Sequence, residues 1–333
     1  MMRGLLIIIT WLLVAPFCRA HPVMNAYLEM AESDDGTTSV TWRHPLPAAT
    51  GMNLEPLYPA EVKVVATQPA QSADGFISEH YVLRGAPRFW SGCALGLKGT
   101  TSSATEVLVR LTLANGQTQV AVLRSPADVF VVPKHAGPGQ AALAYFQFGV
   151  GHILTGVDHL LFVLGLLILV QKRLMLIKTI TSFTVAHSIT LAIATLGYAS
   201  VPLPPLYVGI ALSIFYLGPE IIRQQRGETS LTIEHPWLVA FVFGLLHGFG
   251  IASGLTSLGL AHTDIPFALL MFNLGIEFGQ LCFVFIILVL LHSFKRLEIV
   301  WPRWVAALPC YTVGSLGVFW TIQYTVLMFK SLS

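Results

Sequence analysis

The chain has few charged residues. Asp, Glu, Lys and Arg together make up 11% of its 333 residues, and the formal net charge is only +2. Without a large excess of Lys and Arg, no nucleic-acid partner is expected. Hydrophobic residues make up 54% of the chain and the mean hydropathy is +0.70, which excludes a disordered chain and an ordinary soluble protein. The expected partner is a lipid bilayer.

Cysteine is also scarce. The four cysteines are Cys18, Cys93, Cys282 and Cys310, and no two of them form a CxxC pair. Only Cys93 lies in the domain that we expect to be exported, so neither a disulfide framework nor a zinc knuckle is predicted. The cysteines therefore carry no functional prediction.

Residues 1–20 have the layout of a secretory signal peptide. Arg3 begins it, an apolar run from Leu5 to Val14 follows, and small residues precede an expected cleavage site after Ala20. An uncleaved anchor is the alternative, because the apolar run is near the lower limit for crossing a bilayer. Cleavage would make His21 the first residue, where its amine and imidazole can chelate copper or nickel outside the membrane.

Residues 21–133 are predicted to form an exported, all-β, sandwich-like domain. Strand-like segments separated by turn residues occupy residues 27–30, 39–42, 61–66 and 76–83. Two alternating segments on either side of Asn115-Gly116, at 107–113 and 120–123, predict a β-hairpin. A periplasmic or extracellular partner of this domain stays open. Residues 134–144 are interpreted as a linker.

Residues 145–328 are predicted to form an all-α membrane domain with about six transmembrane helices. The candidate spans are 145–170, 174–197, 204–222, 236–258, 266–292 and 304–328. Each has about 20 residues or more, the length that a helix needs to cross a ~30 Å hydrocarbon core. If residues 21–133 are exported, all loop Lys and Arg residues lie inside, and the outer loops at 198–203 and 259–265 have none. The expected location is the bacterial inner membrane, with the N-terminal domain and the C-terminus outside.

Few polar residues interrupt these spans, and ionisable residues in lipid are functional candidates by default. The candidates are His152, Asp158 and His159 in the first span, His187 in the second, His247 in the fourth, and Asn273 and Glu277 in the fifth. His152 and His159 are seven residues apart and are expected on nearly one helical face. A helical rise of about 1.5 Å per residue places most of the candidates near the bilayer midplane. The arrangement predicts a site with an outward approach.

Imidazole nitrogens and carboxylate oxygens form the ligand set of borderline divalent metals such as Ni²⁺, Co²⁺, Zn²⁺ and Cu²⁺. Transporters bind cargo between helices near the midplane, so we favour a transporter with such a metal as cargo or bound ion. Asp158 or Glu277 can also balance the charge of the cation or carry a counter-moving proton. The alternatives are an intramembrane zinc hydrolase with Asp158 or Glu277 as general base, a haem-bearing electron carrier, and an assembly protein without cargo.

The polar residues of the spans occur in an ordered set of motifs. The motifs are His152-xxxxx-Asp158-His159, FTVAHSITL at 183–191, FGLLHGF at 243–249, and Asn273-xxx-Glu277. This set resembles the HupE/UreJ membrane proteins over residues 145–328, and the exported domain resembles the longer branch of that family. The resemblance implies a nickel or cobalt permease, or an accessory to nickel supply for hydrogenase or urease. It also implies that the His and Asp residues of the first motif bind the metal.

Overall fold

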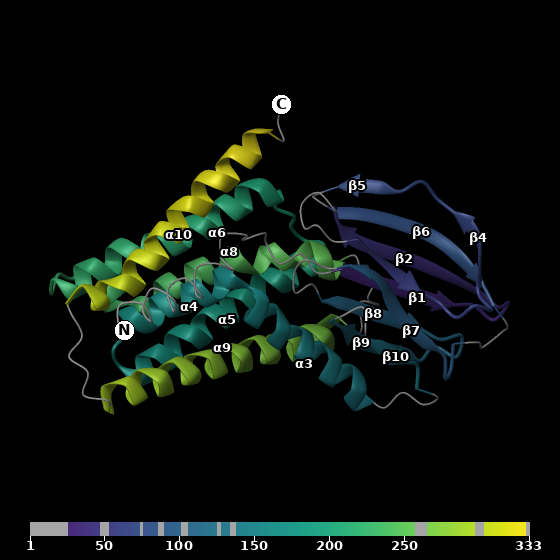
Figure 1. Cartoon of the computed structure of the whole chain (residues 1–333), viewed down its shortest axis with the longest axis horizontal. Helices are drawn as coiled ribbons and strands as arrows, with labels where there is room; N and C mark the ends of the chain where they lie inside the picture. Colours follow the sequence, from purple (N-terminus) through teal and green to yellow (C-terminus); the bar gives the residue numbers. More distant parts are fainter. Residues whose placement is uncertain are drawn as a thin grey trace, which may run out of the picture.

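A computed structural model of the chain describes residues 26–46, 53–73, 76–85, 90–100, 106–124, 128–133, 138–256, 265–296 and 303–330. The predicted signal peptide and His21 lie outside the described residues. Figure 1 shows a β-rich part at one end of a bundle of long helices, with α3 (Pro138–Thr155) reaching from the sheets into the bundle.

The described N-terminal residues form two sheets. The larger sheet has the order β4 (Lys63–Thr67), β6 (Phe76–Arg84), β2 (Thr37–Pro45), β1 (Ala26–Glu32), β8 (Val107–Thr112) and β9 (Thr118–Leu123), with β5 (Gln71–Ala73) beside β6. The smaller sheet has the order β10 (Val129–Val131), β7 (Ala94–Thr100) and β3 (Asn53–Leu57). Strands β1 and β8 are parallel, whereas the other described pairs are antiparallel. The all-β prediction for this part is confirmed.

The predicted hairpin is formed by β8 and β9, which pair in antiparallel register from Val107–Leu123 to Thr112–Thr118. Gly116 has a φ of 79° in the turn, a left-handed conformation that glycine adopts without the penalty of a Cβ. Buried residues of both sheets, including Trp42 of β2 and Leu95 of β7, belong to one hydrophobic core. The two sheets therefore pack on each other as in a sandwich.

The C-terminal part is helical. After α3 it contains α4 (Val157–Leu169), α5 (Arg173–Thr195), α6 (Leu203–Gln225), the short α7 (Leu231–Glu234), α8 (Pro236–Thr256), α9 (Ile265–Arg296) and α10 (Arg303–Lys330). Helix α3 begins at Pro138, inside the segment 134–144 that the sequence suggested as a linker. The Pro ring fixes a φ that suits the first turn of a helix, which explains why the helix begins there.

Four helical segments are long and apolar enough to cross a membrane, namely Arg173–Thr195, Leu203–Gln225, Ile265–Ser293 and Cys310–Phe329. Helices α3 and α4 pass the same test together as a bent pair, and α8 has a shorter apolar stretch at Pro236–Gly250. The protein is therefore an integral membrane protein with about four candidate spans, and the crossing of all six predicted segments stays a prediction.

The helical part is apolar outside and carries polar groups inside. Large apolar side chains such as Phe285 of α9, 67% exposed, cover the outer faces of the helices. Polar residues such as Ser213 of α6 and Gln280 of α9 are fully buried. This distribution suits a protein whose surroundings are lipid.

Three helix pairs pack with their backbones in close approach. At each contact a glycine of one helix lies so near the partner helix that a Cβ would not fit. These glycines are Gly149 and Gly275 (α3 with α9), Gly244 and Gly248 (α5 with α8), and Gly317 (α10 with α6). Small residues permit such close packing of membrane helices, so each pair behaves as one packed unit.

Candidate metal centre

The first predicted span is broken at Gly156. Helix α3 ends at Thr155, α4 begins at Val157, and the two are bent by 72°. Gly156 has φ −75° and ψ 87°, and its amide still donates to the carbonyl oxygen of His152 at 2.9 Å. Glycine has a low helix propensity, which favours an interruption at this position. The expected single helix over 145–170 is thus corrected to two half-helices.

The bend changes how His152 and His159 meet. On a straight helix, seven residues would separate them by about 10 Å along the axis. In the structure their ring centroids are 4.9 Å apart, in an edge-to-face arrangement. The two histidines are neighbours, as expected. They meet because the chain bends at Gly156, and not because they share one face of a straight helix.

Two further helices bring histidines to the same place. The ring centroid of His159 lies 4.9 Å from that of His247 on α8 and 5.9 Å from that of His187 on α5. His152 lies 6.2 Å from His187 by the same measure. All four imidazoles are buried. One ligand atom each from Asp158, His159 and His247 lies within 4.8 Å of the others, so these three residues can hold one metal ion.

A carboxylate fixes the tautomer of His159. The Nδ1 atom of its ring lies 3.0 Å from Oδ1 of Asp158. An ionised carboxylate only accepts hydrogen bonds, so Nδ1 carries the hydrogen and the lone pair is on Nε2. Nε2 is buried and has no hydrogen-bond partner among the described residues. A carboxylate behind an imidazole in this way is typical of histidines that bind metals.

Ser213 of α6 fixes the tautomer of His247 in a similar way. Its hydroxyl donates to the carbonyl oxygen of Ile210 at 2.6 Å, so the same oxygen accepts from Nε2 of His247 at 3.0 Å. The lone pair of His247 is therefore on Nδ1, which is buried without a partner among the described residues. Ser213 is not among the site residues predicted from the sequence. Its one signal was a hydroxyl within the apolar run at 210–217.

The other two histidines are less constrained. Both ring nitrogens of His152 and both of His187 are buried and have no hydrogen-bond partner among the described residues. Because buried polar atoms are nearly always hydrogen-bonded, unpartnered nitrogens on converging rings indicate the place of a ligand. The donor set of imidazole nitrogens and one carboxylate fits a borderline divalent cation.

Asn273 and Glu277 make other contacts. Oε1 of Glu277 accepts from the hydroxyl of Thr181 on α5 at 2.7 Å, and the amide of Asn273 donates to the Leu269 carbonyl of its own helix at 2.8 Å. One turn further along α9, Oε1 of Gln280 accepts from the Thr184 hydroxyl at 2.9 Å. The structure therefore places Glu277 in a polar contact between α5 and α9, and the described contacts do not join it to the four histidines.

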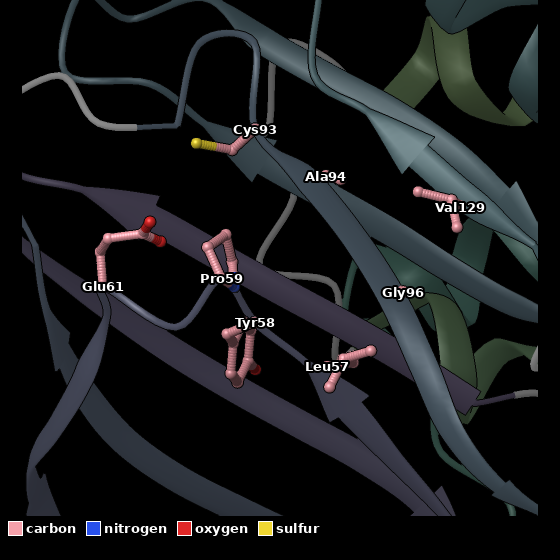
Figure 2. A pocket seen from close by; sticks show the side chains of 8 residues that line it. All are labelled: Leu57, Tyr58, Pro59, Glu61, Cys93, Ala94, Gly96 and Val129. Carbon is pink, nitrogen blue, oxygen red and sulfur yellow. The ribbon is translucent and has the colours of Figure 1, made fainter.

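The β domain has a pocket of its own, of about 430 Å³, at the smaller sheet. Figure 2 shows Cys93 and Glu61 at one end of it, and Leu57 and Val129 at the other. Burial raises the pKa of the Cys93 thiol, and the nearby Glu61 carboxylate raises it further. The lining of this pocket offers one thiol and one carboxylate as possible metal ligands, fewer than the side chains that converge among the helices.

Comparison with known proteins agrees with this picture. A family model described as "HupE / UreJ protein" matches residues 129–324, which is more than half of the chain and includes all seven predicted site residues. No curated protein and no solved structure matches the chain. The chain belongs to the HupE/UreJ family of metal-related membrane proteins.

Proposed function

We propose that this protein carries a divalent transition-metal cation across the membrane, with nickel or cobalt as the favoured cargo. The proposed centre consists of His152, Asp158, His159, His187 and His247. One observation carries the proposal: four buried imidazoles and one carboxylate converge from α3, α4, α5 and α8, and each imidazole has a ring nitrogen without a partner among the described residues. The family favours nickel or cobalt over zinc or copper.

The ligands differ in how firmly they are held. His159 and His247 are oriented by Asp158 and Ser213, whereas the rings of His152 and His187 have no such support among the described residues. Conduction requires binding that is strong enough to admit the ion and weak enough to release it. Two oriented imidazoles hold the cation, and two freer ones exchange on and off it as the cation enters and leaves.

The broken first span suits the same role. The last carbonyl groups of α3 carry the partial negative charge of a helix C-terminus, which favours a cation nearby. Asp158 lies in the first turn of α4, where the partial positive charge of the N-terminus favours its carboxylate. Discontinuous helices of this kind form the binding sites of many secondary transporters.

The proposed topology has six crossings in the bacterial inner membrane, with α3 and α4 as one bent crossing and α8 as another. The β domain and the C-terminus are outside. The packing supports this orientation, because Leu108 of the β domain shares a core cluster with Leu191 near the end of α5 and with Ile265 at the start of α9. The charge of the loops predicts that the end of α5 and the start of α9 lie on the outer side of the membrane.

A second candidate is an intramembrane zinc hydrolase. The hydrogen bond between Asp158 and His159 favours it, since resident zinc sites often have a carboxylate behind a ligating histidine. A hydrolase holds its zinc permanently and keeps one coordination position open for water. Stoichiometric zinc that survives chelation would favour this candidate, whereas exchangeable metal favours a carrier.

The test is uptake of Ni²⁺, Co²⁺, Zn²⁺ and Cu²⁺ into proteoliposomes that contain the purified full chain. His159→Ala removes a ligand and Asp158→Asn removes the charge, so we expect both variants to lose saturable uptake while the protein still inserts. His235→Ala is the matched control, because His235 is an exposed histidine after α7. Normal uptake by both site variants would refute the proposed centre. Resident zinc without uptake would support the hydrolase.

A further inference from the structure

The β domain packs directly on the half-helix that carries His152. Tyr27 of β1, 3% exposed, and Leu108 of β8 lie in one core cluster with Phe148 of α3. The ring centroids of Tyr27 and Phe148 are 6.3 Å apart in an edge-to-face arrangement, and those of Phe148 and Phe272 of α9 are 5.5 Å apart. The ring centroid of Phe272 in turn lies 5.8 Å from that of His152. Contiguous packing therefore connects the β domain with the outer end of the metal centre.

A carboxylate of the β domain reaches the same half-helix. Glu106 precedes β8, and its side chain is 4% exposed. Oε1 of Glu106 accepts from Nε of Arg124 at 2.7 Å, and Nη2 of Arg124 also donates to the Gln147 carbonyl of α3 at 3.3 Å. Oε2 of Glu106 is buried and has no hydrogen-bond partner among the described residues. Oε2 of this carboxylate is thus available to another partner.

The carboxyl group of Glu106 lies against Gly151, the residue before His152. It fills the space that a Cβ at Gly151 would occupy. Gly151 therefore permits the close approach of a charged side chain to the helix backbone. Neighbouring residues of an α-helix point about 100° apart, so Glu106 in this position is beside His152 without facing its ring.

The charge of Glu106 is only partly compensated. Burial raises the pKa of its carboxyl group, and the hydrogen bond and charge of Arg124 oppose this effect. Arg124 is 48% exposed, so solvent weakens the attraction that it supplies. A cation that arrives from outside meets a buried carboxylate oxygen with no hydrogen-bond partner among the described residues.

We propose that Glu106 is an outer ligand of the transport path, which exchanges Arg124 for an incoming divalent cation and passes that cation to His152. The proposal rests on the proposed transport function and gives the β domain a part in it. Arg124 holds the carboxylate away from His152 until a cation competes for it. Release from Arg124 then allows the carboxylate to turn across Gly151 toward the unpartnered nitrogens of His152.

The test compares two variants that break the same ion pair. Initial rates of Ni²⁺ and Co²⁺ uptake are measured in proteoliposomes over a range of external concentrations. Glu106→Gln removes the ligand, so we expect KM to rise about tenfold, the lower end of the change for a lost ligand-supporting group. Arg124→Gln frees the ligand, so we expect KM to fall. The maximal rate and the metal content at saturation are expected to stay unchanged in both.

Glu29 and Arg110 provide a matched control, because they form a similar part-buried ion pair at 3.0 Å within the same domain. Glu29→Gln and Arg110→Gln are expected to leave KM unchanged. Equal shifts of KM in the same direction for Glu106→Gln and Arg124→Gln would overturn the proposal and leave the pair a docking contact. If Glu106→Gln fails to fold, Glu106→Asp is measured in its place. Glu106→Ala is a further test of the ligand, and uptake by this variant with the wild-type KM would equally overturn the proposal. Absence of uptake by the wild type would instead overturn the transport function itself.

Discussion

The substitution Gly156→Ala tests whether the break in the first span builds the metal centre. A Cβ at this position would lie 2.8 Å from the His152 carbonyl oxygen, 3.0 Å from Nδ1 of His159 and 3.3 Å from Oδ1 of Asp158. The backbone itself tolerates alanine, because φ is −75°. The lack of space beside the ligands, rather than the backbone conformation, therefore requires glycine.

The size of the effect follows from these distances. Ordinary contacts between such atoms are about 3.5 Å, so the neighbours must move by roughly 0.5 Å. The Asp158–His159 hydrogen bond lies directly against the added methyl group. Disturbing a group that orients a metal ligand typically costs about 10-fold to 100-fold in metal affinity. We expect a loss of that size for Ni²⁺ and Co²⁺.

The assay is equilibrium binding of Ni²⁺ and Co²⁺ to the purified chain in detergent. Gly250→Ala is the control, since among the described side chains a Cβ at Gly250 on α8 would meet Ile210 Cδ1 at an ordinary 3.5 Å. The control is expected to bind like the wild type. If Gly156→Ala also binds both metals with wild-type affinity, the break does not position the ligands, and the reasoning that connects it with the centre is refuted.

Three further predictions concern the surroundings of the centre. Ser213→Ala removes the acceptor for Nε2 of His247 and should weaken metal binding by about tenfold. Ser188→Ala should not, because the Ser188 hydroxyl donates to the Thr184 carbonyl of its own helix; a titration with Ni²⁺ compares the two variants. Gly248→Ala places a methyl group against His187 and Thr190, so thermal unfolding in detergent should show a loss of about 1–3 kcal/mol, and an unchanged melting temperature would contradict the close α5–α8 packing. Glu277→Gln should retain the metal content that His159→Ala loses, because Glu277 contacts Thr181 rather than the histidines. An equal loss of bound metal in the two variants would indicate that Glu277 is a ligand after all.

Local sequence patterns predicted those features of the structure that depend on interactions within a few residues. The Asn115-Gly116 turn between alternating segments predicted the β8–β9 hairpin, because turn chemistry and side-chain alternation act over a few residues. Rare ionisable residues in apolar spans pointed to the histidines that converge, since lipid makes such residues costly. These predictions needed no knowledge of how distant elements pack.

Other features depend on contacts between distant residues. The partnership of Ser213 with His247 joins two helices, and the position of Glu106 against Gly151 joins two domains. Neither leaves a periodic pattern in the sequence. The break at Gly156 was hidden for another reason: a single glycine is tolerated within membrane helices, so an apolar run of sufficient length predicted one continuous span.

The glycine contacts also determine which helices carry the candidate ligands in closely packed pairs. His152 belongs to the α3–α9 pair, to which the β domain is fastened, and His187 and His247 belong to the α5–α8 pair. Asp158 and His159 are on α4, whose buried face shares one core cluster with α6 and α10 and also with Phe183 of α5 and Ala240 of α8. The candidate ligands thus come from several packed groups of helices, and the 72° bend at Gly156 separates the helix of His152 from that of Asp158 and His159. In the proposed transporter, movement of these groups against one another would change the coordination of the cation without the unwinding of a helix.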